Sequence, residues 1–474
     1  MDTECNTTYL DFPILGRREL VADFDGGDIT SDGGALLLRT VEHLTGILRQ
    51  FAACFTDHRD PDLIEHPLLD LVAQRVYALA LGYEDLNDHD DLRRDPLLAA
   101  VVGKADPTGR TRQRRRDRGK ALAGKSTLNR LELTKVGADA GSRYKKITCR
   151  TRDVERLFVT LFLQAHTTPP ERIVLDLDAT DDPVHGHQLG RFFHGYYKNY
   201  CYLPLSIFCG AHLLCARLRP ADIDASAGAV KQLQRVVAQI REVWPDVRIT
   251  IRADSGFCRE ALMAWCEGHG VDYVLGLAQN TRLKALITAE QEQARSEFER
   301  TEQPARVFAE LEYRTLDSWS RARRVVAKAE HLAKGANPRF VVTSLSATER
   351  AAQPLYEEDY CGRGEAENRI KEQQLHLFAD RTSAATMRAN QIRLFFSSIA
   401  YVLLEALRRL GLAGTEWARA QCQTIRLKLL KIGALVRVTV RKVWVHLASS
   451  CPTAEVFRQV HARLSRLSPL VLRC

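Results

Sequence analysis

Acidic residues at the ends of two apolar runs are the first candidates for chemistry in this sequence. Asp176 and Asp178 lie two residues apart in IVLDLD, so a strand there turns both side chains to one face. Asp254 directly follows VRITIRA. Open α/β sheets place their sites at the carboxyl ends of strands, and a buried carboxylate is costly unless a partner such as a metal ion neutralises it. The alternative is that these aspartates cap helices, form turns or pair with basic side chains.

A third acidic residue lies in YCGRGEAENRIKEQQ, a segment predicted to be helical. One helical face would carry four side chains, spaced three, four and four residues apart: Tyr360, Arg363, Glu367 and Lys371. A face of this composition is not a core stripe. Glu367 could therefore complete a metal site while Arg363 and Lys371 contact phosphates. An exposed Glu367–Lys371 pair is the plainer alternative.

Strands and helices must position these side chains. From Glu171 onward the patterns predict three strands, a helix, a strand, a helix and a strand, which is an α/β sheet covered by helices. The tail IRLKLLKIGALVRVTVRKVWVHLA alternates apolar and basic residues, which predicts strands with one cationic face. The expected organisation has five parts: a helical N-terminal DNA-binding region (1–165), the first part of the core (166–280), a β-rich insertion (281–338), the second part of the core (339–412) and a basic C-terminal region (413–474).

Three ordered motifs connect these elements to a known family. D-A-T begins at Asp178, R-A-D-S-G-F contains Asp254, and Y-x2-R-x3-E-N-R-I-K contains Glu367. Together they resemble the DDE transposases of bacterial insertion sequences, in particular the group numbered thirteen-eighty within the insertion-sequence-four superfamily. STLNRLE, HGHQLGRFFHGYY, YLPLSIF and RLKLLKIGA agree with that group, so the resemblance covers nearly the whole chain.

The resemblance implies an RNase H-like catalytic core with a β-rich insertion before the final glutamate. Matched residue by residue, the catalytic and metal-binding triad falls on Asp178, Asp254 and Glu367, and Asp176 is an alternative first ligand. Three carboxylates suit two Mg²⁺ (or Mn²⁺) ions that activate a nucleophile and stabilise the leaving oxygen.

Three further residues follow from the same resemblance. Tyr360 and Arg363 match the first two positions of a Tyr-Arg-Glu-Lys signature. The position of its lysine is occupied by Gln374, so Lys371, one turn earlier, would have to replace it in holding phosphate. Trp319, in the insertion, is a candidate for stacking on a flipped base, although packing in the core is the more common role of such a tryptophan.

Charge distribution identifies candidate DNA-binding surfaces. The chain of 474 residues carries a net charge of +9, and the segment from Thr415 to Cys474 holds eleven Lys or Arg residues against two acids. A second cluster lies between Arg110 and Lys120. Clusters of this kind match phosphate backbones, although each could equally be a solvated loop. The DNA-binding candidates in these clusters are Arg114, Arg115, Arg116, Lys428, Lys431 and Arg437.

The remaining features favour a reduced, intracellular environment. The twelve cysteines are scattered without a CxxC pair, the sequence begins with polar residues, and no segment is apolar enough to span a membrane. We therefore expect a cytoplasmic, nucleoid-associated bacterial protein. Its partners would be double-stranded DNA (inverted terminal repeats and target DNA) and a second copy of itself in a synaptic complex.

Four other interpretations remain open. GKALAGKS, from Gly119, fits a phosphate-loop pattern, but the basic residues before it cannot form a buried strand. His185, His187 and His194 are close together but lack a cysteine that would complete a structural zinc site. The chain could also be a domesticated DNA-binding protein without cleavage, or an RNase H-like nuclease that does not transfer strands.

Overall fold

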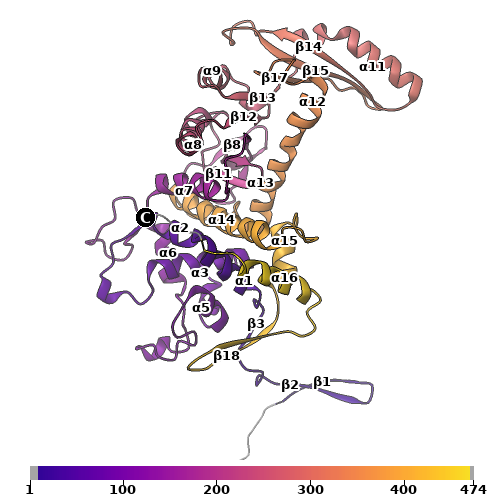
Figure 1. Cartoon of the computed structure of the whole chain (residues 1–474). Helices are drawn as coiled ribbons and strands as arrows, with labels where there is room; N and C mark the ends of the chain where they lie inside the picture. The colour runs from indigo at the N-terminus through magenta and orange to yellow at the C-terminus, as the bar shows by residue number, and fades with distance from the viewer. Residues whose placement is uncertain (1–8, 470–474) are drawn as a thin grey trace, which may run out of the picture. The chain divides into compact units, whose positions relative to one another are not determined.

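The computed structural model describes residues 9–469, which divide into two compact units (Figure 1). The larger unit contains residues 49–59 and 131–405. The smaller unit contains residues 9–48, 60–130 and 406–469, so both ends of the described chain contribute to it. Each unit is described separately below.

A mixed sheet of nine strands forms the centre of the larger unit. Its strand order is β11-β10-β6-β12-β13-β17-β15-β14, with β16 paired to β15. The strands are β6 (Arg172–Ala179), β10 (Leu205–Cys209), β11 (His212–Arg217), β12 (Arg248–Ala253), β13 (Asp272–Leu277), β14 (Ala305–Tyr313), β15 (Arg323–Leu332), β16 (Gly335–Ala336) and β17 (Arg339–Thr343).

Only the three central strands β6, β12 and β13 run parallel to one another, and the other pairings are antiparallel. The parallel strands are buried apolar runs such as Ile249–Ile251 in β12, as expected for strands covered on both faces. Their carboxyl ends therefore meet at one edge of the sheet, where Asp178 and Asp254 lie. The prediction of an α/β fold is confirmed, and the sheet is large and mixed.

Helices cover this sheet, and Figure 1 shows α8 and α9 close to β12 and β13. α8 has a strongly amphipathic pattern, and buries Leu233, Val236, Val237 and Ile240. The helices of this unit are α7 (Thr151–Gln164), α8 (Ala229–Val243), α9 (Glu260–Gly268), α10 (Thr281–Leu286), α11 (Thr288–Thr301), α12 (Ala352–Pro354), α13 (Gly364–Leu377) and most of α14 (Met387–Leu407).

The expected β-rich insertion begins with helices. α10 and α11 occupy most of residues 281–301, and α11 lies along β14 and β15 (Figure 1). The sequence TAEQEQARSEFERT is mostly polar, but it is also rich in residues with high helix propensity, and this preference decides the structure. The strands that follow, β14 and β15, join the central sheet through β17 rather than forming a separate sheet.

Two small sheets complete the larger unit. β4 (Phe55–Asp57) pairs with β5 (Ile147–Cys149), and β7 (Asp182–Pro183) pairs with β9 (Asn199–Tyr202), which in turn pairs with β8 (Phe192–His194). β7 begins three residues after β6 ends, so the β7-β9-β8 sheet is a direct continuation of the strand that carries Asp178.

The smaller unit is mainly helical, as predicted for the N-terminal region. α3 (Leu68–Leu81) ends at Gly82, whose φ of 97° suits glycine. The other elements are α1 (Ala35–Thr45), α2 (Ile47–Ala52, partly in the larger unit), α4 (His89–Leu92), α5 (Pro96–Val102), α6 (Lys125–Leu133, mostly in this unit), α15 (Cys422–Ile425), α16 (Ala454–Ser465), β1 (Leu10–Leu15), β2 (Arg18–Ala22), β3 (Ile29–Thr30), β18 (Ala434–Val438) and β19 (Val443–Leu447).

The basic tail is only partly extended. Residues 422–430 are helical, and strands begin at Ala434, so the prediction of strands from Ile425 onward was wrong for its first part. Arg426, Leu427 and Lys428 all favour helix, and this local preference prevails over the alternation. β18 pairs with both β19 and β3, which ties the tail to the N-terminal segment.

Candidate active site

Asp178 and Asp254 lie at the ends of neighbouring parallel strands. In the β6–β12 ladder Asp176 is opposite Arg252 and Leu177 is opposite Ala253. Continuing this register by one residue places Asp178 beside Asp254, on strands that are about 4.8 Å apart. Asp254 also caps the turn Ser255–Phe257 by accepting a hydrogen bond of 2.9 Å from the Gly256 backbone N–H.

The electrostatics of Asp178 show that three carboxylates converge there. Burial raises the pKa of Asp178, and the negative charges of Asp254 and Glu367 raise it further. A hydrogen bond of 3.0 Å from the Thr180 hydroxyl and the charge of Arg363 oppose this rise. The three acidic residues singled out from the sequence are therefore within electrostatic reach of one another.

Asp176 occupies a different environment on the same strand. Its carboxylate is 3% exposed and is held in two places by Arg252, with Nε–Oδ1 at 2.5 Å and Nη2–Oδ2 at 2.8 Å. Arg252 also donates to the Asp359 carbonyl at 2.5 Å, which links the pair to the turn before α13. Burial raises the pKa of Asp176, and Arg252 opposes this rise. Both oxygens of Asp176 are thus engaged inside the protein.

Glu367 projects from the first turn of α13 and pairs with Arg363, at 2.6 Å between Oε1 and Nη1. Burial lowers the pKa of Arg363, but the charges of Glu367, Tyr360, Asp178 and Asp254 more than compensate and raise it. The Arg363 guanidinium therefore lies among the three carboxylates and partly neutralises them. Glu367 thus pairs with Arg363 on this helical face.

Two residues that position this helix were not identified from the sequence. Gly276, near the end of β13, has no room for a side chain, because a Cβ there would lie 2.5 Å from the Tyr360 hydroxyl and 3.0 Å from the Ser255 nitrogen. In the sequence analysis Arg252 appeared only as part of the motif R-A-D-S-G-F. The feature that could have identified it is a basic residue in a strand whose neighbouring residues are buried.

The two residues considered for the last position of the signature have different surroundings. Gln374 donates a hydrogen bond of 3.0 Å to the Asp181 carbonyl, and so ties α13 to the turn after β6. Lys371, one turn earlier, is exposed. No ion pair of Lys371 is found among the described residues.

The donor chemistry fits a divalent cation that prefers oxygen. Asp178, Asp254 and Glu367 offer only carboxylate oxygens. Partial burial, and then repulsion by Asp254 and Glu367, raise the pKa of Asp178. Within residues 9–469 no three His, Cys, Asp or Glu side chains are assembled as a metal site, and Glu367 is instead paired with Arg363. His187 contacts Arg191 at 2.9 Å, and the three clustered histidines likewise form no metal site.

The basic loop between α5 and α6 exposes Arg114, Arg115 and Arg116. Asp106 organises this loop by accepting five hydrogen bonds, from the backbone and hydroxyl groups of Thr108 and Thr111 and from the Gly109 backbone. Although burial opposes it, these bonds lower the pKa of Asp106. The loop thus presents three arginines from a fixed turn.

The basic tail divides into exposed and engaged side chains. Lys428 and Arg437 are exposed, as a phosphate-binding role requires. Lys431 differs from these two residues because it has partners inside the protein. Its ammonium lies 2.6 Å from the buried Asp32 carboxylate and 4.1 Å from the Tyr83 ring centroid. The charge of Lys431 is used within the smaller unit, contrary to its selection as a DNA contact.

Trp319 packs inside the larger unit. It is 3% exposed, with its ring 5.8 Å from Tyr313 in an edge-on arrangement and 5.4 Å from the Arg323 guanidinium. In this structure its ring is covered, which matches the packing alternative rather than base stacking.

The phosphate-loop pattern has a structural explanation. Among the described residues no strand directly precedes GKALAGKS, and Lys125 instead contacts Asn87 at 2.9 Å and Asp90 at 3.5 Å.

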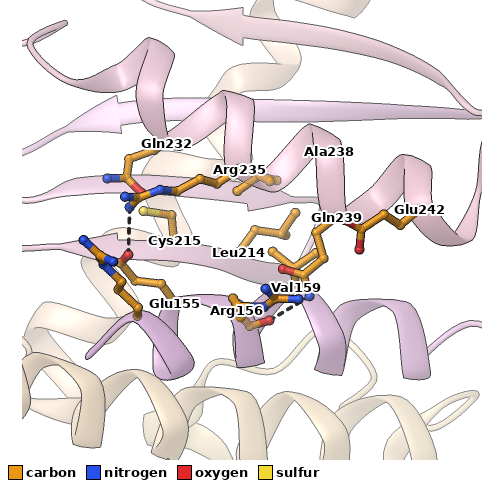
Figure 2. A pocket seen from close by; sticks show the side chains of 12 residues that line it. Glu155, Arg156, Val159, Leu214, Cys215, Gln232, Arg235, Ala238, Gln239 and Glu242 are labelled. Atoms are coloured by element: carbon orange, nitrogen blue, oxygen red, sulfur yellow. Dashed lines mark hydrogen bonds and ion pairs between the residues drawn. The ribbon is translucent and has the colours of Figure 1, made fainter. Parts of the chain in front are cut away.

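A pocket of about 410 Å³ lies between α7, β11 and α8. Figure 2 shows its lining, where Arg235 pairs with Glu155 at 3.1 Å. None of the predicted site residues lines this pocket.

The chain matches a family of known proteins over nearly its whole length. A family model described as "Transposase DDE domain group 1" matches residues 12–469. A solved piggyBac transposase synaptic complex with hairpin DNA is similar over 93% of this chain and 86% of that chain, at 11% identity and a TM-score of 0.42. The search of curated proteins gave no match. Among the described helices none is both long and apolar enough to cross a membrane.

Proposed function

The chain belongs to the group-1 DDE transposase family and is a DNA transposase, and we propose that it cleaves and joins DNA at the inverted terminal repeats of an insertion sequence. Asp178, Asp254 and Glu367 are the proposed catalytic residues. The observation that carries this assignment is the convergence of their charges at the ends of β6 and β12. We further propose that this insertion sequence belongs to the thirteen-eighty group, which the motifs resemble.

The order of elements supports an RNase H-like core. The antiparallel strands β6, β10 and β11 are followed by α8, β12, α9 and β13, and the last two strands lie parallel to β6. In this arrangement the first two carboxylates lie on adjacent strands and the third approaches from α13.

The three carboxylates would hold divalent cations, Mg²⁺ or Mn²⁺ and two in number. When bound, such ions activate a water or a DNA 3′-OH and stabilise the leaving oxygen. Asp176 is not needed as a ligand, since Arg252 occupies both its oxygens. It holds β6, β12 and the turn before α13 together instead.

Arg363 has two possible partners in this reaction. Without DNA it is paired with Glu367. A phosphate at the strand ends would compete for the guanidinium, because Arg binds phosphate and carboxylate in the same bidentate manner. Arg363 and Tyr360 therefore position the scissile phosphate, and exposed Lys371 would contact the same backbone.

The exposed arginines 114–116, with Lys428 and Arg437, would bind the terminal repeats through their phosphates. We further propose that two copies of the chain bring two transposon ends together in a synaptic complex. DNA that carries the terminal repeats flanking the gene would test both the binding of the repeats and the pairing of two transposon ends.

The central experiment replaces Asp254 with Asn, which removes one negative charge at nearly constant shape. Nicking of a labelled terminal-repeat duplex in Mg²⁺ should be lost, and binding of the same duplex in EDTA should persist because the basic surfaces lie elsewhere. Asp246→Asn, at an exposed position, is the matched control and should cut normally. Cleavage by purified Asp254→Asn protein would overturn the mechanism.

The wild-type reaction separates this function from its two alternatives. A transposase joins the cleaved 3′ end to a target duplex. Cutting without joining would identify a nuclease, and repeat binding without cutting would identify a domesticated DNA-binding protein.

A further inference from the structure

An aromatic surface beside the proposed active site is not explained by the reaction described so far. It belongs to the hairpin formed by β8 and β9, which continues from the strand that carries Asp178. Phe193 is 58% exposed, Tyr196 at the hairpin tip 84% and Tyr200 48%. Three large rings left in water at one hairpin are costly unless another molecule covers them.

The hairpin geometry groups these rings with positive charge. Phe193 and Tyr200 are direct cross-strand partners, with ring centroids 5.6 Å apart. The Arg191 guanidinium lies 4.4 Å from the Tyr200 centroid, and Lys198 is exposed at the tip. Residues 183–221 contain no Asp or Glu, and Asp181, just before the hairpin's own sheet begins, accepts from Asn199 at 3.2 Å. The charged side chains that the hairpin itself carries, Arg191 and Lys198, are therefore positive and favour a negatively charged partner.

Tyr197 fixes the hairpin tip to the site. Its hydroxyl donates to the Ala179 carbonyl at 3.1 Å, one residue beyond Asp178. Its ring contacts Tyr196 edge-on at 5.0 Å. Burial raises the pKa of Tyr197, and the charge of Asp178 adds to this rise. Tyr197 therefore anchors the tip of the hairpin, with the neighbouring Tyr196, to the end of the strand that carries Asp178.

We propose that Phe193, Tyr196 and Tyr200 form a stacking platform for unpaired nucleobases of the DNA strand adjacent to the scissile phosphate. The proposal rests on the proposed function, because that function is what brings DNA to the carboxylates. Aromatic faces stack on bases of any sequence, and a neighbouring arginine strengthens the contact. In a duplex the base faces are covered by their neighbours, so the platform selects unpaired bases. A protein partner, such as a second copy of the chain, is a less suitable occupant than DNA, because this hairpin has no acidic residues of its own to pair with a protein's basic side chains.

The test uses the full chain in EDTA, where no cleavage occurs, with two probes of equal length. One is single-stranded oligo-dT that carries one 2-aminopurine, and the other is a mixed-sequence duplex. Binding is followed by anisotropy, and stacking by quenching of the 2-aminopurine. The Phe193→Ala, Tyr196→Ala double variant should lose on the order of tenfold or more in affinity for oligo-dT and should lose the quenching. Its duplex affinity should change less than twofold.

Two further variants control this result. Phe193→Tyr with Tyr196→Phe keeps both rings and should retain wild-type binding and quenching. Tyr144→Ala removes another exposed tyrosine that also has an arginine over its ring, at 4.9 Å, but lies in the loop between α6 and β5. It should behave as wild type.

Three outcomes would overturn the platform. The first is unchanged oligo-dT binding by the alanine variant. The second is an equal loss for both probes. The third is dissociation of a wild-type dimer by the alanine substitutions in sedimentation, which would show that a second copy covers the rings. Failure of the proposed function is distinguishable, since a wild-type chain that does not nick terminal-repeat DNA can still be scored for oligo-dT binding.

Discussion

At the scale of single residues, Asp176 and Asp178 differ despite sharing a strand and a face. Asp176 is neutralised by Arg252, and both its oxygens are bonded. Asp178 is half-buried beside two other carboxylates, and its charge is stabilised by hydrogen bonds from Thr180 and the Ala179 N–H and by the charge of Arg363. Asp176 therefore stabilises the fold. Asp178 lowers the stability of the fold, and its carboxylate serves the chemistry of the site.

This contrast predicts opposite effects for two matched variants. Asp176→Asn leaves the Arg252 charge buried without its partner, so unfolding by urea should require about 3–5 kcal/mol less free energy. Asp178→Asn removes a repelled charge, so the metal-free protein should be at least as stable as wild type, while nicking is abolished. A stable but inactive Asp176→Asn protein beside an active Asp178→Asn protein would reverse the assignment.

A second residue-scale feature is the buried His89 in the smaller unit. Gln74 Nε2 donates to the Ala123 carbonyl at 2.8 Å and contacts His89 Nδ1 at 3.0 Å, and Gln74 Oε1 accepts from the Ala123 N–H at 3.0 Å. The amide orientation is thereby fixed, so Nδ1 must accept. Burial, aided by Arg75, lowers the pKa of His89 to about 3.

His89 therefore predicts how stability depends on pH. The unfolded chain takes up a proton near pH 6.5 and the folded chain only near pH 3, so stability present above pH 6.5 is lost as the pH falls. The slope is at most about 1.4 kcal/mol per pH unit. Urea unfolding of His89→Gln between pH 7 and 4 should show a shallower slope than wild type. His446→Gln, at an exposed position, should not, and equal slopes for all three proteins would refute this role.

At the scale of elements, the two basic segments present their charges differently. The loop between α5 and α6 is set by Asp106 and exposes arginines 114–116. In the tail, Lys431 is held by Asp32, whereas Lys428 and Arg437 remain exposed. A basic cluster in the sequence therefore contains both structural and exposed charges.

Two variants should separate these roles. Replacing Arg114, Arg115 and Arg116 with Ala should make the dependence of log affinity on log salt shallower, by about 0.9 for each phosphate that the variant no longer binds, without changing the melting temperature. Lys431→Ala should instead lower the melting temperature, because Asp32 loses its buried partner, and should keep the salt slope. An unchanged slope in the triple variant would mean that these arginines face only solvent.

Much of the element order could be predicted from the sequence, and the errors have physical causes. β6, β12 and β13 were recognisable as short apolar runs, and α8 as an amphipathic repeat. α11 was missed because it is polar nearly all round and buries little beyond Ala294. In the tail, helix propensity outweighed an alternating pattern. The partners of Asp176 and Lys431 are 76 and 399 residues away (252 − 176 and 431 − 32), and no local pattern carries that information.

At the scale of the whole molecule, the smaller unit is assembled from both ends of the described chain. Arg426 donates to the carbonyls of Ala80 and Leu79 at the end of α3, at 2.9 and 3.2 Å. Gly34 donates to the Leu430 carbonyl at 3.0 Å, and a Cβ on Gly34 would lie 2.0 Å from the Leu429 oxygen. The C-terminal segment is therefore part of the core that supports the N-terminal helices.

Removal of that segment should affect the two units unequally. In a chain that ends at residue 405, the helices between residues 60 and 130 lose their packing partners, whereas the central sheet retains all its strands. Limited proteolysis should then cut within residues 60–130 first and leave a fragment near residues 131–405. Equal resistance of residues 60–130 in the shortened and full-length chains would show that the N-terminal helices fold without the tail.

The assembly of one unit from both chain ends also imposes an order on biosynthesis. Domains tend to fold as they leave the ribosome, and residues 131–405 contain every strand of the central sheet together with Asp178, Asp254 and Glu367. The smaller unit contains segments synthesised before residues 131–405 and segments synthesised after them. It therefore remains incomplete until β18 has been synthesised and pairs with β3. A ribosome that stalls late in the message therefore releases a chain with its three carboxylates in place and its smaller unit unfinished.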